Sequence, residues 1–342
     1  MYAKDKKIVC LGIESTAHEF SCGIASSTGE IMANTGRTYV PKEGGIHPRE
    51  ASQFFSTVAG DVLNEAFKES KIKPSDIGVV AFSQGPGLGP CLRTGATMAR
   101  ALSIQLSVPL VGVNHCIAHI EIGKHVTGVK DPVTLYVSGG NTIVTAYESG
   151  KYRIFGETLD IAIGNCLDVF ARAANLPYPG GPIVEKLAKK GHNLIQLPYI
   201  VKGMDLSFSG LLTAAIRTIN GDYTIEDICF SVQEYAFSML TEVTERALAH
   251  TEKKEILLTG GVAANKRLQE MLRSISSEHN AQFFTVPAKY AGDNGAMIAW
   301  TGLLAYSYGR TVPVEKSYVR QRWRLDATTV PWVKGGAINA SH

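Results

Sequence analysis

The chain lacks most features that would place it in a specialised class of protein. Its six cysteines form no C-x-x-C pair, so we expect no disulfide framework and a reducing, cytoplasmic compartment. We find no apolar run long enough to span a bilayer and no signal-peptide core. The net charge is only +3, which does not by itself predict nucleic-acid binding. The H-E-x-x-H motif of zinc peptidases and the dinucleotide-binding G-x-G-x-x-G are also missing.

The sequence does contain a repeated architecture. A short strand, a small-residue turn and two more strands are predicted within residues 8–35 and again within 133–158. Alternating helix and strand patterns follow each repeat. This predicts two similar α/β lobes of mixed sheet with a cleft between them. We expect an N-terminal lobe at 1–131, a C-terminal lobe with a helical insertion at 132–310, and a basic tail at 311–342.

Small-residue turns follow strands at three places. Ser15 and Thr16 end the first strand, residues 138–141 end the first strand of the second repeat, and residues 260–265 join a later strand to a helix. Such residues let backbone N–H groups approach a bound phosphate closely. An ordinary hairpin turn remains the alternative for the first two, and Asn265 in the third could simply cap the following helix.

Two histidines indicate a metal site. His115 and His119 are four residues apart at the start of a predicted helix, which places both imidazoles on one face. Asp293, just before the last helix, offers a carboxylate as a further ligand. The alternatives are two capping or core histidines and an aspartate that caps its helix.

Two carboxylates that follow the second repeat in the chain are candidates to bind ribose hydroxyls. Asp168 lies on a predicted helix and Glu185 follows a Pro/Gly-rich loop. Asp168 could instead pair with Arg172 one turn away, and Glu185 could be a solvated helix charge.

Seven short motifs in a fixed order make the sequence resemble the Kae/TsaD/Qri family, the tRNA adenosine threonylcarbamoyltransferases. At Tyr136 and Asn141 the sequence resembles the archaeal and eukaryotic cytosolic (KEOPS) branch of this family. The resemblance covers about residues 8–309. The motifs are Gly12–His18, Gly85–Gly87, Asn114–His119, Tyr136–Thr142, Pro179–Pro182, Lys202–Gly210 and Thr259–Asn265.

This resemblance implies an actin-like, Hsp70-like ATPase fold with two RNase H-like lobes. It implies one metal ion, with iron as first choice and zinc as second, held by His115, His119, Asp293 and, as a fourth ligand, Tyr136. It also implies threonylcarbamoyl-AMP or ATP in the cleft. The implied contacts to that nucleotide are Tyr136, Val137, Ser138, Gly139, Gly140, Asp168, Gly181, Glu185 and Asn265.

The implied reaction moves threonylcarbamoyl from threonylcarbamoyl-AMP to the adenosine beside the anticodon in tRNAs that read ANN codons. Glu14 and His18 are our candidates to accept the proton released in the reaction.

The implied partners are tRNA and the KEOPS subunits: a small atypical kinase/ATPase on a separate chain, a dimerising adaptor and a tRNA-tail binder. We expect an apolar helix surface around Phe54 and Phe55 to serve one interface. Local basic candidates for phosphate contacts are Arg93, Lys186, Lys189, Lys190, Arg320, Arg322 and Arg324.

Three other functions stay open. A small-molecule kinase of the same fold would carry Asp where this chain has Glu14. A metallopeptidase would need a water-activating carboxylate beside the histidines, and Glu121 points off their helical face. The third alternative is a binding module without catalytic activity.

Overall fold

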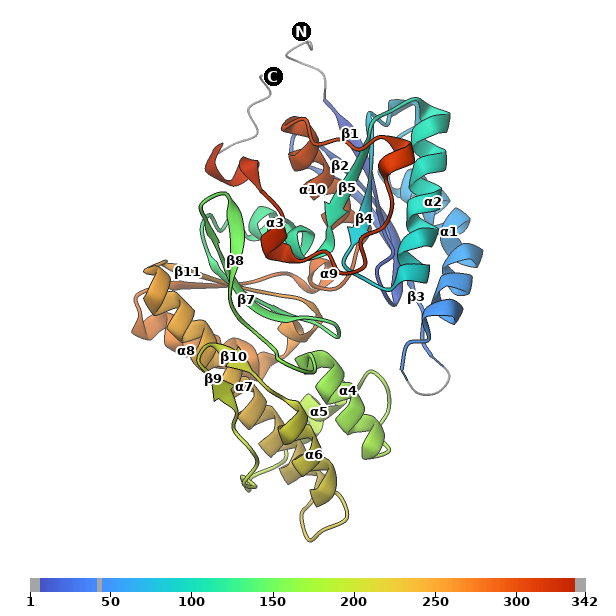
Figure 1. The fold of residues 1–342 in the computed structure, drawn as a ribbon. Helices are drawn as coiled ribbons and strands as arrows, with labels where there is room; N and C mark the ends of the chain where they lie inside the picture. The colour runs from blue at the N-terminus through green and yellow to red at the C-terminus, as the bar shows by residue number, and fades with distance from the viewer. Residues whose placement is uncertain (1–6, 42–44, 336–342) are drawn as a thin grey trace. The chain divides into compact units, whose positions relative to one another are not determined.

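The computed structural model describes residues 7–41 and 45–335 (Figure 1). Residue contacts divide the chain into unit 1, which is Met1–His125, Glu148–Tyr152 and Asp293–His342, and unit 2, which is Val126–Tyr147 and Arg153–Gly292. The chain therefore leaves unit 1 and returns to it at Asp293, whereas the sequence places the whole of 132–310 in one lobe. The outer ends of the predicted first lobe and tail, 1–6 and 336–342, lie outside the described residues.

The sheet of unit 1 has five strands in the order β3-β2-β1-β4-β5. The first three pair antiparallel, and β1, β4 and β5 are parallel. The strands are β1 (Val9–Glu14), β2 (Glu19–Ser26), β3 (Ile31–Thr38), β4 (Val79–Gly85) and β5 (Leu110–Asn114).

The sheet of unit 2 repeats this order, as β8-β7-β6-β11-β12. β6 and β7 are antiparallel, and β6, β11 and β12 are parallel. The predicted duplication of an α/β architecture is confirmed. The strands are β6 (Val133–Val137), β7 (Thr142–Glu148), β8 (Lys151–Glu157), β11 (Glu255–Thr259) and β12 (Gln282–Thr285).

Helices cover both faces of the first sheet. α1 (Pro48–Ser70) and α2 (Gly89–Leu106) pack on one face, and α10 (Gly295–Ser307) packs on the other (Figure 1). α2 begins five residues before the predicted start at residue 94, because Pro90 is well suited to a first helical turn. The expected apolar surface on α1 is only partly present, since Phe55 is fully buried in the core.

Alternation along β1 decides which residues meet which helix. Leu11 and Ile13 join the apolar cluster that includes residues of α1 and α2. Gly12 and Glu14 point to the opposite face, where α10 lies. The approach there is so close that a Cβ on Gly12 would stand 2.2 Å from the backbone nitrogen of Ala299. Packing against this face sets the position of the segment just before α10.

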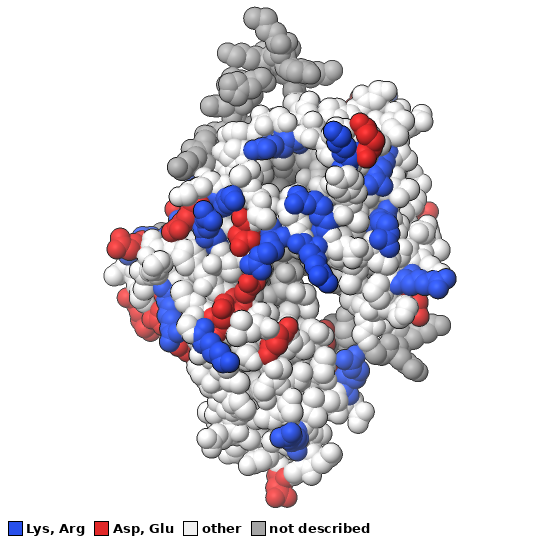
Figure 2. Space-filling view, in the orientation of Figure 1, with Lys and Arg blue, Asp and Glu red and all other residues white. Residues whose placement is uncertain are grey.

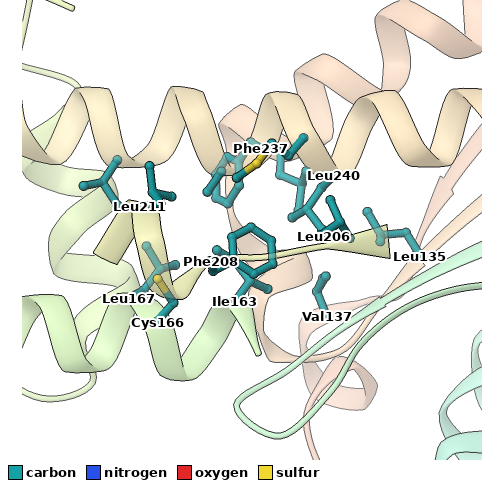
Figure 3. Packing of buried hydrophobic residues seen from close by; sticks show 14 of the residues in the cluster. Leu135, Val137, Ile163, Cys166, Leu167, Leu206, Phe208, Leu211, Phe237 and Leu240 are labelled. Carbon is teal, nitrogen blue, oxygen red and sulfur yellow. The ribbon is translucent and has the colours of Figure 1, made fainter. Parts of the chain in front are cut away.

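Unit 2 has a large helical layer. The helix α7 runs for 27 residues and packs against β6 and neighbouring helices. Figure 3 shows Phe237 and Leu240 of this helix facing Phe208, Leu206 and Leu135 in the core. The remaining elements are α4 (Ile163–Ala173), α5 (Gly180–Ala188), β9 (Val201–Lys202), β10 (Asp205–Leu206), α6 (Ser209–Thr218), α7 (Ile225–Thr251), α8 (Lys266–Glu278) and α9 (Ala288–Ala291).

The segment predicted as a basic tail is tied to unit 1 over residues 312–335, which we call the C-terminal strap. Its Val312 N–H donates to the Leu110 carbonyl over 2.8 Å, and its Arg320 N–H donates to the Gln84 carbonyl over 2.7 Å. The Asn114 side chain donates to the Trp323 carbonyl over 3.2 Å. The strap therefore follows the ends of β4 and β5.

The cysteines are all free thiols in the interior, in agreement with the absence of a disulfide framework. Within the described part of the chain, no helix has both the length and the apolarity needed to cross a membrane.

Candidate functional site

Three predicted ligands come together in unit 1. His115 opens α3 (His115–Thr127), His119 follows one turn later, and Asp293 lies just before α10. The Asp293 Oδ1 atom lies 3.1 Å from His119 Nε2 and 3.4 Å from His115 Nε2. One ligand atom from each residue lies within 4.8 Å of the others. Both histidines are buried, so the cluster is largely screened from water.

Neighbouring residues cap the two helices, so the side chains of His115 and Asp293 stay available for the cluster. Asn294, and not Asp293, caps α10, with its side-chain oxygen accepting from the Met297 N–H over 2.9 Å. The alternative reading of Asp293 as a helix cap is therefore wrong. Asn114 accepts from the Cys116 N–H over 3.0 Å and from the Ile117 N–H at the start of α3. His115 is thus free of any capping role.

Glu14 lies behind this cluster and is completely buried. Its Oε2 atom lies 3.0 Å from His115 Nδ1, and its Oε1 accepts from the Thr16 N–H over 2.6 Å. A carboxylate on the second nitrogen of an imidazole fixes the ring and its tautomer, leaving the other nitrogen for a metal. This geometry places Glu14 where its carboxylate can orient the ring of His115.

The charges of the cluster are strongly coupled. Burial opposes a charged His115, but the Glu14 and Asp293 carboxylates outweigh it and raise the pKa of His115 well above its usual value. Burial lowers the pKa of His119. Burial would raise the pKa of Asp293, yet the charge of His115 and hydrogen bonds from both imidazoles hold that pKa well below its usual range.

The donor set fits a transition-metal ion. Two ligands bonded to one tetrahedral ion at ~2.1 Å lie about 3.4 Å apart, which is close to the observed separations of Asp293 Oδ1 from the two imidazoles. Two imidazoles and one carboxylate suit iron or zinc. Tyr136 belongs to unit 2, where its hydroxyl accepts from the Asn141 side chain over 3.4 Å. Its role as a fourth ligand stays a prediction.

His18 lies at the exposed edge of the cluster. Its Nδ1 atom is 3.7 Å from Asp293 Oδ2, and 40% of its side chain is exposed. Among the predicted catalytic residues, His18 is therefore accessible to a substrate and Glu14 is not.

Two glycine loops meet at the carboxyl ends of β6 and β11 in unit 2. The Ser138 hydroxyl accepts from the N–H groups of Gly140 and Asn141, which shapes the first loop, while a Cβ on Gly139 or Gly140 would meet nothing within 4 Å. Gly260 has φ +97 and would place a Cβ 2.1 Å from the Val137 carbonyl oxygen, so only glycine fits there. Open backbone at the carboxyl ends of parallel strands is a common place for a phosphate.

The other predicted nucleotide contacts of unit 2 also have structural partners. Asp168 accepts from the Gly180 N–H over 2.8 Å, next to Gly181. Glu185 accepts from the Lys266 N–H over 3.1 Å and pairs with Lys189. Asn265 does cap α8, with its oxygen accepting from the N–H groups of Arg267 and Leu268 and its amide donating to Gln233. Their contact with a nucleotide stays a prediction.

Sequence reasoning missed Asp160, which organises one of the recognised motifs. Its carboxylate accepts from the Phe208 N–H over 2.9 Å and from the hydroxyls of Ser207 and Ser209 over 2.6 Å each. Partial burial opposes its charge, but the hydrogen bonds from Ser207 and Ser209 outweigh that and lower the pKa of Asp160. Asp160 lies in the irregular stretch between the end of β8 at Glu157 and the start of α4 at Ile163, so it gives no periodic signal by which it could have been found.

We expect Asp160→Asn to destabilise unit 2 by about 1–2 kcal/mol at pH 7, a modest figure because the carboxylate is exposed to screening water. The depressed folded-state pKa means that its stabilisation is present above the unfolded pKa of about 4 and is lost as pH falls through the folded pKa. Urea denaturation at pH 7 and at pH 3 measures this difference, which should shrink at pH 3. An equal difference at both pH values would contradict a role for the charge.

Fold and site together define a protein with an actin-like fold that carries a His–His–Asp cluster of metal-binding character. The chain belongs to the TsaD family, tRNA N6-adenosine threonylcarbamoyltransferase, whose model matches residues 30–300.

Individual relatives agree with this assignment. A protein of Archaeoglobus fulgidus named tRNA N6-adenosine threonylcarbamoyltransferase is 56% identical over 95% of this chain and all of its own length. A probable bifunctional tRNA threonylcarbamoyladenosine biosynthesis protein of Methanocaldococcus jannaschii is 55% identical over 96% of this chain, which spans only 61% of that relative. Among solved structures, T. kodakarensis HypF matches 91% of this chain and 49% of its own with a TM-score of 0.62 at 16% identity, which is a likeness of fold alone.

Proposed function

We propose that this chain transfers a threonylcarbamoyl group from threonylcarbamoyl-AMP to N6 of the adenosine beside the anticodon in tRNAs that read ANN codons. Membership of the TsaD family carries the proposal, because relatives named for this activity are 56% and 54% identical to the chain over 95% and 94% of its length. The buried cluster of unit 1 and the glycine loops of unit 2 support it, since both contain recognised motifs.

The reaction is an acyl transfer whose atoms balance simply. The N6 amine attacks the carbamoyl carbon of the mixed anhydride, a C–N bond forms, the C–O bond to phosphate breaks, and AMP leaves. One proton leaves N6. An adenine amine is a weak nucleophile, so positioning of the two reactants is expected to supply much of the rate.

We propose that His115, His119 and Asp293 hold one ion, iron as first choice and zinc as second. When bound, the ion would polarise the donor as a Lewis acid. Glu14 orients His115 through Nδ1. We assign the N6 proton to His18, because its imidazole is exposed beside the cluster while both oxygens of Glu14 are engaged.

In unit 2, we propose that the backbone N–H group of Gly139 binds the phosphate of the donor, joined by the N–H group of Gly140 once it leaves the Ser138 hydroxyl, 3.3 Å away. The loop is exposed and offers no side chain that would block an anion. Oriented N–H groups stabilise the charge that grows on the leaving phosphate. Asp168 and Glu185 are proposed to bind ribose hydroxyls.

For tRNA, we propose phosphate contacts from basic residues of unit 1, where Lys and Arg side chains gather over the region of α2 and the C-terminal strap (Figure 2). Arg322 of the strap is exposed, whereas Arg324 is engaged by Asp326 over 3.1 Å and Arg320 stacks on Trp323. With a net charge of +3, the grip on tRNA is proposed to be shared with KEOPS subunits.

Two alternatives lose support in the structure. A kinase would use the carboxylate at position 14 for phosphoryl transfer, but Glu14 is buried against His115. A metallopeptidase would need a free carboxylate beside the histidines, yet the buried Glu121 accepts from the Tyr152 hydroxyl over 2.6 Å.

The test is a transfer assay with threonylcarbamoyl-AMP and unmodified tRNA, with and without the partner subunits, read by mass spectrometry of the digested nucleosides. Threonylcarbamoyladenosine should appear at the position beside the anticodon. A metal-loaded chain that forms none in either setting, yet phosphorylates a small substrate with ATP, would favour the kinase instead.

We expect Glu14→Gln to weaken metal binding about 10–100-fold while the fold is retained, because the ring of His115 loses its charged partner. Metal affinity is measured by competition with a chelator, and the transfer rate is measured at limiting and saturating metal. If Glu14 only positions His115, saturating metal restores the rate. A rate that stays low in the fully loaded variant would instead make Glu14 the proton acceptor. Glu121→Gln, at a buried carboxylate with another partner, is the matched control.

A further inference from the structure

A cavity lies within unit 1, beside the C-terminal strap. Its volume is about 290 Å³, near the lower end of the range of small-ligand pockets. It shares no residue with the metal cluster or with the glycine loops. Its lining includes Asn114, Ile117, Thr301, Arg310, Trp323 and Trp332.

Three polar groups in this lining are buried without a hydrogen-bond partner. They are the Thr301 hydroxyl and the indole N–H groups of Trp323 and Trp332. Thr301 as a whole is only 2% exposed. Buried polar groups in native proteins are nearly always paired, and an indole N–H can only donate. Three such groups on residues that line one cavity are donors that a bound hydrogen-bond acceptor would satisfy.

The charges of the lining select the kind of acceptor. Arg310 and Arg320 bring two guanidinium groups, and the described lining contains no Asp or Glu. Arg320 lies over the ring of Trp323, 4.2 Å from its centroid, and Arg310 donates to the Thr329 hydroxyl over 3.3 Å. Cations and N–H donors with no carboxylate nearby favour an anion.

Apolar residues also line the cavity, and they accommodate the body of such a ligand. Ile117, Val113 and Ala305 line the cavity together with the two indole rings. Flat apolar groups stack well on indole, and the volume limits the ligand to the size of a small metabolite.

We propose that this cavity is a binding site for a small organic anion. Its carboxylate or phosphate head accepts hydrogen bonds from the Thr301 hydroxyl and the two indole N–H groups, beside Arg310 and Arg320, and its flat apolar body lies against the indole rings. The proposal does not depend on the transfer reaction, since none of these residues belongs to the proposed metal cluster or to the glycine loops.

The three tryptophans of the chain allow a direct test, because two line the cavity and Trp300 does not. The indole N–H signals of the ¹⁵N-labelled full chain are followed by NMR during titration with benzoate, phenyl phosphate and, as neutral control, benzyl alcohol. The Trp323 and Trp332 signals should shift saturably with at least one anion, with a midpoint of about 1 mM or lower, while Trp300 stays unchanged. Benzoate and phenyl phosphate distinguish a carboxylate head from a phosphate head.

Variants tie the shifts to the proposed contacts. Thr301→Val keeps the shape of the side chain and should raise the dissociation constant about 5-fold, the value of one hydrogen bond. Thr134→Val is the matched control, because its hydroxyl is also buried without a partner but lies outside this cavity, and it should leave binding unchanged. The proposal would be overturned if the indole signals did not shift with either anion or shifted equally with benzyl alcohol. It would also be overturned if Thr301→Val left the dissociation constant of the anion unchanged.

Discussion

Replacing His119 with alanine is expected to remove the bound ion and to lower the transfer rate about 10²–10³-fold. The residue is one of the three proposed ligands, and its Nε2 atom lies 3.1 Å from Asp293 Oδ1 in a completely buried position. An ion held by two remaining ligands binds far more weakly, and its contribution to the reaction is lost with it. Metal content by mass spectrometry and the transfer rate are measured on the same preparation.

The third histidine of α3 provides the control. His125 stacks on Trp300 with ring centroids 4.0 Å apart and contacts the Gly29 carbonyl oxygen, so it has no part in the cluster. His125→Ala should keep the ion and the transfer activity. Asp293→Asn keeps the volume of the side chain and is expected to lose the ion and the transfer activity, as His119→Ala is. Full metal content in the His119 and Asp293 variants would show that the ion binds elsewhere.

Replacing Gly23 with alanine is expected to destabilise unit 1 by about 3 kcal/mol or more, a fall in melting temperature of about 6–12 °C. A Cβ on this residue of β2 would stand 2.1 Å from the backbone nitrogen of Ala296, and neither backbone can yield without moving α10. Because Asp293 lies just before α10, metal affinity should fall as well. Calorimetry and metal titration measure the two effects.

Gly60 gives a control of opposite sign. It lies in α1, and a Cβ there would meet nothing within 4 Å, so Gly60→Ala should stabilise the chain by about 0.5–1 kcal/mol through helix propensity. If Gly23→Ala melted at the temperature of the parent chain, the close contact between β2 and α10 would be wrong.

Much of the fold could be predicted from the sequence because its signals are local. The apolar run at residues 8–13 and the recurrence of the same strand pattern at 133–158 predicted the first strands of both sheets, and the four-residue spacing of His115 and His119 predicted two of the three residues of the cluster. These signals need no knowledge of distant contacts.

The rest depends on packing between residues far apart in the chain. The return of the chain to unit 1 at Asp293 follows from glycines of two strands, Gly12 and Gly23, lying directly on α10, and small residues carry no pairing signal in one sequence. Asn294 caps α10, which leaves the Asp293 side chain available for the cluster. In the sequence, either of these two adjacent polar residues could have been the cap. The strap had the composition of a tail, yet its backbone is bound along β4 and β5.

The most direct test is anomalous X-ray diffraction from crystals of the metal-loaded chain, recorded on both sides of the iron and zinc absorption edges. One anomalous peak is expected about 2.0–2.2 Å from Nε2 of His115, Nε2 of His119 and a carboxylate oxygen of Asp293. A peak bound by other residues, or a loaded crystal in which the two imidazoles turn away from Asp293, would contradict the proposed metal centre.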